Sequence, residues 1–105
     1  MRKITSDAYN AFINNKRFKS SNTEVRIEDG EIAMYLHGNK IAETQDNQIF
    51  ISAGGYRPSR TTRERLNAFP EVHLSIKKGK WVIANKIAWD GKWTSLNKFE
   101  EAYER

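Results

Sequence analysis

The 105-residue sequence contains no cysteine, only two prolines and no long apolar run. Without cysteine the chain can form no disulfide and offers no thiolate as a nucleophile or metal ligand. A membrane-spanning helix needs about 20 consecutive apolar residues, and the longest apolar run here is far shorter. The start, MRKITSDAYN, lacks the apolar stretch of a signal peptide. We therefore expect a cytoplasmic protein that does not associate with a membrane.

Histidine is scarce, and the sequence motifs of common active sites are missing. His37 and His73 are the two histidines, and neither has a second ligand at a metal-binding spacing. No serine stands in a nucleophile-elbow motif, and neither of the common glycine-rich phosphate loops is present. We therefore expect no metal site, no cofactor, no catalytic residues and no enzymatic activity.

The chain is basic and rich enough in aromatic side chains to fold. It has 18 Lys and Arg against 13 Asp and Glu, a net charge of +5, and 11% aromatic residues. Large rings bury much area each, which compensates for a mean hydropathy of −0.78. The length suits one domain over residues 1–105. The charge permits nucleic acid, a nucleotide or an acidic protein as partner, although basic residues can also serve solubility alone.

Alternating apolar residues predict an antiparallel meander in the first half. A short helix is expected over residues 5–15, capped by Thr5 or Ser6. Strands follow around residues 25–27 and 32–36, joined at Asp29-Gly30, and then at 40–44 and 48–52.

The second half mixes helices with further strands. The run Thr61-Thr62-Arg63-Glu64 fits a capping box at a helix start, and Pro70 would end that helix. Strands are predicted over 72–76 and 81–84, and a last helix is expected to begin with Asn97 as its cap. The predicted fold class is α+β: a single small domain with a mostly antiparallel sheet of about six strands and two or three short helices packed on it.

Three tryptophans lie close together, and core packing is their favoured role. Asp90-Gly91 predicts a further hairpin between Ile87 and Ser95. A two-residue turn would put Trp89 and Trp93 on opposite faces, whereas a three-residue loop would pair them on one face. The sequence leaves both registers open.

The stretch GGYRPSRTTRER, residues 54–65, carries four arginines around a predicted helix start. At 100° per residue, Thr62 and Leu66 face the core, with Arg63 and Arg65 on either side. A helix N-terminus already carries partial positive charge, and Glu64 is the one acidic residue between positions 54 and 70. A bound phosphate or carboxylate would relieve this repulsion. Alternatively, Glu64 pairs with an arginine and the others only cover the sheet.

We predict a ligand site in this stretch. The arginines would contact phosphate, a tyrosine would stack on a base, an asparagine would bond a base or ribose, and two glycines would let the backbone approach. The predicted residues are Gly54, Gly55, Tyr56, Arg57, Arg60, Thr61, Thr62, Arg63, Arg65 and Asn67. Two further basic clusters, at 16–19 and 77–80, support nucleic-acid binding only if they share a face with these arginines.

Several segments together resemble a family of short proteins of tailed bacteriophages. They are LHGNKIAE at 36–43, ISAGGYRPSRTTRERLNAF at 51–69, KKGKWVI at 77–83 and AWDGKW at 88–93. The resemblance implies a phage accessory protein acting in the cytoplasm of a bacterial host, where such proteins commonly disarm defences or redirect host machinery by binding.

The sequence is consistent with three functions. The first is non-enzymatic binding of a phosphate-bearing ligand, either nucleic acid or a nucleotide-type signal, through the arginine-rich helix start. The second is inhibition of a host protein, with the arginines facing an acidic surface. The third is a homo-oligomeric scaffold that uses a free sheet edge.

Overall fold

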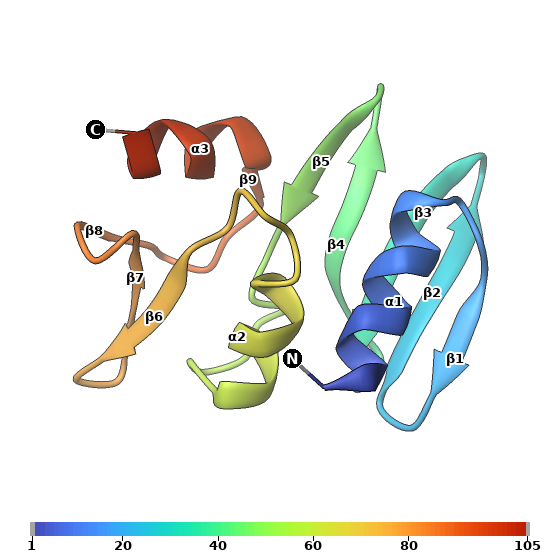
Figure 1. The fold of residues 1–105 in the computed structure, drawn as a ribbon, viewed down its shortest axis with the longest axis horizontal. Coiled ribbons are helices and arrows are strands. Elements are labelled where there is room, and N and C mark those ends of the chain that lie inside the picture. Colours follow the sequence, from blue (N-terminus) through green and yellow to red (C-terminus); the bar gives the residue numbers. More distant parts are fainter. Residues whose placement is uncertain (1, 105) are drawn as a thin grey trace.

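The computed structural model describes residues 2–104 and confirms the α+β class (Figure 1). Three helices accompany two antiparallel sheets. The elements run in the order α1 (Lys3–Ile13), β1 (Phe18–Ser20), β2 (Thr23–Glu28), β3 (Glu31–Leu36), β4 (Asn39–Gln45), β5 (Gln48–Ile51), α2 (Arg60–Leu66), β6 (Leu74–Lys77), β7 (Lys80–Ile83), β8 (Ile87–Ala88), β9 (Thr94–Ser95) and α3 (Leu96–Glu104).

The first five strands form the predicted meander, and β9 extends it to a six-stranded sheet. Its strand order is β1-β2-β3-β4-β5-β9, with every neighbour antiparallel. The hairpin at Asp29-Gly30 is confirmed, because Glu28 and Glu31 pair across it. Asp29 and Gly30 both have positive φ, 51° and 82°, as the tight two-residue turn between twisted strands requires.

A bulge in β4 turns two consecutive side chains into the core. Met34 lies opposite Ala42 and Tyr35 lies opposite Lys40, so Ile41 has no partner in β3. Ile41 and Ala42 are both fully buried, which regular alternation would forbid. This packing favours glycine at position 54, because a Cβ there would lie 3.0 Å from Ile41 Cγ2.

The predicted hairpin at Asp90-Gly91 is wrong in both of its registers. β8 pairs with β7 in a separate three-stranded sheet, β6-β7-β8, whereas β9 pairs with β5 in the large sheet. The segment 89–93 therefore crosses from one sheet to the other. There the Gly91 carbonyl accepts hydrogen bonds from the Ala53 amide, at 2.8 Å, and from the Ser52 hydroxyl.

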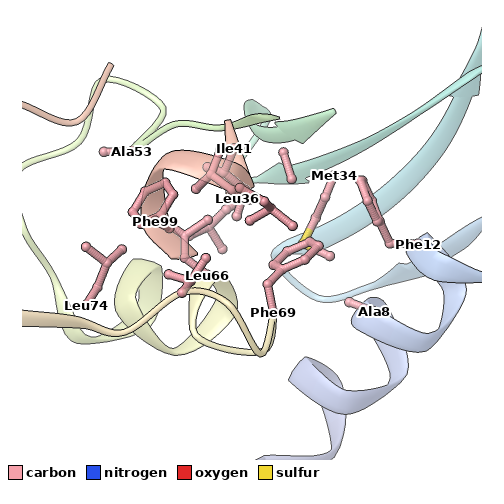
Figure 2. Packing of buried hydrophobic residues seen from close by; sticks show 14 of the residues in the cluster. Ala8, Phe12, Met34, Leu36, Ile41, Ala53, Leu66, Phe69, Leu74 and Phe99 are labelled. Atoms are coloured by element: carbon pink, nitrogen blue, oxygen red, sulfur yellow. The ribbon is translucent and has the colours of Figure 1, made fainter. Parts of the chain in front are cut away.

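One hydrophobic core lies between the helices and both sheets (Figure 2). Phe69, in the segment after α2, packs edge-to-face against Tyr9 and Phe12 of α1, with ring centroids 5.2 and 5.3 Å away. Two of the three tryptophans take the expected core role. Trp81 and Trp89 are buried against each other, whereas Trp93 is 44% exposed.

The helix starts differ from those predicted. α1 begins at Lys3, and Thr5 is a buried residue within it instead of a cap. α2 is capped by Ser59, whose hydroxyl accepts from the Thr62 amide, so the capping box at Thr61 does not form. α2 ends at Leu66, before Pro70 is reached. Within residues 2–104, no helix is both long and apolar enough to cross a bilayer.

Candidate functional site

An open groove of about 750 Å³ runs between α2 and the start of β6. Three arginines line it, and we call it the arginine groove. It includes four of the predicted site residues and adds three that sequence reasoning had not assigned to a site. Its lining residues are Arg2, Arg60, Thr61, Arg63, Glu64, Asn67 and Leu74.

Glu64, the one carboxylate that residues 2–104 contribute to the groove, is bound by three protein side chains. The Arg2 Nε atom lies 2.9 and 3.1 Å from the two Glu64 oxygens, and Arg65 Nη1 lies 2.8 Å from Oε1. The Thr5 hydroxyl donates a further hydrogen bond to Oε1. Burial opposes ionisation of Glu64, but the hydrogen bonds from Thr5 and Arg2 and the arginine charges outweigh it and hold its pKa below the ordinary 4.5.

This depressed pKa predicts acid sensitivity. A carboxyl group whose pKa is lower in the folded state stabilises the protein above its unfolded pKa, and this contribution is lost as pH falls through the folded value. We expect the free energy of unfolding to fall below about pH 4.5, and to fall less steeply in Glu64→Gln. Urea denaturation across this range measures it. Glu100→Gln, on the exposed side of α3, should keep the wild-type profile, and an unchanged profile in Glu64→Gln would contradict the assignment.

Arg65 lies inside the protein, which corrects its predicted role as a phosphate contact. Its side chain is almost fully buried, with Nε 2.9 Å from Thr23 Oγ1 and Nη1 2.7 Å from Thr5 Oγ1. A further bond joins Nη2 to Asn22 Oδ1. Burial, then the charge of Arg2, lowers its pKa, although arginine stays protonated at neutral pH. Arg65 therefore joins α2 to α1 and β2.

Arg60 and Arg63 remain as uncompensated charges. In the part of the chain that the structure describes, neither guanidinium has an ion-pair or hydrogen-bond partner. Their nearest carboxylate along the helix, Glu64, is committed to Arg2 and Arg65. The groove therefore presents two positive side chains that no group within residues 2–104 neutralises.

Asn67 has a structural task instead of the predicted bond to a base or ribose. Its side-chain amide donates to the Leu74 carbonyl and accepts from the Leu74 amide, both at 2.9 Å. It thus acts like a strand partner and fastens the start of β6 to α2. Thr62 is also occupied: it is buried, and it receives a hydrogen bond from the Ser59 hydroxyl.

The first four predicted residues, Gly54 to Arg57, lie outside the groove. The Tyr56 hydroxyl donates to the Leu36 carbonyl at 2.8 Å and accepts from Asn39 Nδ2 at 2.6 Å. These bonds fix Tyr56 at the turn between β3 and β4, away from the predicted stacking position beside the arginines. Arg57 is exposed. The structure thus brings together Arg60, Thr61, Arg63 and Asn67 and separates the rest.

Neither histidine belongs to the groove. His73 stacks on Tyr103 with ring centroids 4.0 Å apart, and His37 lies edge-on to Tyr56 at 6.2 Å. Across residues 2–104, no three His, Asp or Glu side chains are placed to hold a metal ion.

Comparison with known proteins gives a family assignment. No curated protein and no solved structure matches the chain. Residues 1–103 match the family described as Kyanoviridae Gp96 protein. This match covers nearly the whole sequence and confirms the resemblance to a family of short phage proteins. The chain therefore belongs to the Kyanoviridae Gp96 protein family, a family of bacteriophage proteins.

Proposed function

We propose that this phage protein is a non-enzymatic accessory protein that binds a phosphate-bearing ligand, nucleic acid or a nucleotide, in the arginine groove. The observation that carries the proposal is the charge imbalance there. Arg60 and Arg63 have no partner among the described residues, and the one nearby carboxylate, Glu64, is already bound to Arg2 and Arg65. A phosphate would accept paired hydrogen bonds from such planar guanidinium groups.

The chemistry of the groove supports holding a ligand instead of transforming it. Its lining supplies guanidinium donors and the hydroxyl of Thr61, whereas histidine is absent from the lining within residues 2–104. Glu64, the one carboxylate, is held ionised by its partners and is a poor proton donor at neutral pH. Sequestering a nucleotide or covering nucleic acid would suit a protein that counters host defences in the host cytoplasm.

The double variant Arg60→Ala/Arg63→Ala tests the proposal. Hydrogen bonds to charged groups contribute about 1.5–3 kcal/mol each, so we expect affinity for the ligand to fall at least tenfold. Fluorescence anisotropy with labelled duplex DNA, labelled single-stranded RNA and a labelled ATP analogue measures the change. Arg60 is exposed and Arg63 half-buried, and neither has a partner in the described chain, so the fold should be unaffected.

A matched control removes the same charge elsewhere. Lys16→Ala/Arg17→Ala takes two exposed positive side chains from the segment after α1 and should leave affinity near the wild-type value. Equal losses in both double variants would mean that overall charge, and not the groove, governs binding. A wild-type protein that binds none of the three probes would overturn the proposal.

A second candidate function is inhibition of a host protein, favoured by exposed apolar side chains near the C-terminus. Ile87, Trp93 and Tyr103 are 36%, 44% and 56% exposed. Large aromatic side chains are enriched in protein interfaces and often anchor them. In this case the arginine groove would face an acidic surface. The purified host protein would then bind Arg60→Ala/Arg63→Ala more weakly than the wild type, and the wild type would not bind the phosphate-bearing probes.

A further inference from the structure

The turn between β6 and β7 concentrates positive charge at the tip of a hairpin. Lys77 and Lys80 lie directly opposite each other, and Lys78 and Gly79 form the two-residue turn with positive φ of 52° and 72°. Like charges directly opposite across a sheet are destabilising. None of the three lysines has an ion-pair partner in the described part of the chain. We call these three residues the lysine turn.

One strand, β6, leads from the arginine groove to the lysine turn. Leu74, the first residue of β6, lines the groove. A strand rises about 3.3 Å per residue, so Lys77 lies roughly 10 Å further along. The clamp of Asn67 on Leu74 fixes the start of this strand to α2. In Figure 1, the β6–β7 turn and the chain leading into α2 lie at the same lower end of the molecule.

We propose that the arginine groove and the lysine turn form one basic track that binds the sugar–phosphate backbone of duplex nucleic acid. The inference rests on the proposed function and names its ligand. One strand of a duplex places a phosphate every 3.4 Å or so along the axis, so a track of roughly 10 Å spans about three. A single nucleotide would leave the lysine turn unused.

The lining of the groove favours a duplex over a single strand. Proteins that bind single strands usually stack bases on aromatic side chains. No aromatic side chain lines the groove within residues 2–104, and Tyr56, the nearest in sequence to α2 on its N-terminal side, is bonded to Leu36 and Asn39. Charge alone suffices for a duplex backbone, whose bases are already stacked.

The test is the salt dependence of binding in the triple variant Lys77→Gln/Lys78→Gln/Lys80→Gln. Each lost phosphate contact should reduce the slope of log K against log salt by about 0.9, so we expect a slope shallower by about two to three. Labelled duplex DNA and duplex RNA are the probes, with the ATP analogue as a measure of the groove alone. Affinity for that analogue should not change.

A matched control is Lys16→Gln/Arg17→Gln/Lys19→Gln, which removes three exposed charges from the α1–β1 side and should keep the wild-type slope. If the lysine variant keeps that slope while Arg60→Ala/Arg63→Ala loses binding, the track is wrong and the groove proposal stands. A slope that falls equally in the control also overturns the track. If the wild type binds the ATP analogue or single-stranded RNA but neither duplex, the track is wrong and the groove proposal stands. If it binds none of these probes, both proposals fail together.

Discussion

Replacing Arg65 by alanine is expected to lower the free energy of unfolding by about 3–5 kcal/mol, because it removes a large buried side chain together with the hydrogen bonds that this side chain donates. The variant would remove the donors to the hydroxyl oxygens of Thr5 and Thr23 and one of the two donors to Asn22 Oδ1, and it would leave a void between α1, α2 and β2. Denaturation in urea, followed by circular dichroism, measures the loss. For a domain of this size, that is a large fraction of the total free energy of unfolding.

Two further variants separate the buried network from the general effect of removing an arginine. Arg63→Ala, two positions from Arg65 on the same helix but without a partner in the described chain, should stay within about 0.5 kcal/mol of the wild type. Arg65→Met keeps volume and should cost less than alanine, since Glu64 still has Arg2. A loss below about 1 kcal/mol in Arg65→Ala would show that the network adds little to stability.

Phe69→Ala is the second change with a large expected effect. Truncating a fully buried phenylalanine costs about 3–5 kcal/mol through lost transfer energy and the cavity left behind. Phe69 is 1% exposed, and its ring meets both Tyr9 and Phe12 edge-to-face. It therefore joins the segment after α2 to α1. Thermal and urea unfolding should both report the loss.

The matched aromatic variant is Tyr103→Ala, which removes a ring that is 56% exposed. It should cost no more than about 0.5–1.5 kcal/mol, the range for an aromatic pair, because its stacking on His73 is its one ring contact in the described structure. Phe69→Leu should lie between wild type and Phe69→Ala. Equal stability of Phe69→Ala and Tyr103→Ala would contradict the packing of α1 on this segment.

Local sequence patterns predict strand pairing correctly where the paired strands are adjacent in sequence. The turn at Asp29-Gly30 joins strands that are adjacent in sequence, so alternation and turn residues together determine the pairing. The same signal failed at Asp90-Gly91. There the Asp90 carboxylate accepts from the Lys92 amide within the turn, but the Gly91 carbonyl accepts from the amide of Ala53, which follows β5. The hydrogen bond to a residue distant in sequence determines the path of the chain, and the residues beside the turn give no indication of it.

The candidate site shows the same division. Helical periodicity put Arg63 beside the core stripe of α2, and the structure places it in the groove. Periodicity put Arg65 in an equivalent position, yet it is buried, because its acceptors Thr23 and Thr5 lie 42 and 60 positions away in sequence. Arg2 also lines the groove, although no sequence pattern near it predicts this. A charged residue is buried or exposed according to its partners, and these come from the tertiary fold.

The order of strands in the large sheet carries a consequence for chain entropy. The first four pairings join consecutive strands through short connections, whereas about 40 residues, including α2 and the small sheet, separate β9 from β5. Each doubling of loop length costs about 0.6 kcal/mol, and β9 offers two paired residues in return. Strand pairing alone therefore contributes little to holding β9 beside β5. Its place depends on α3, which follows at once and anchors Leu96 and Phe99 in the core.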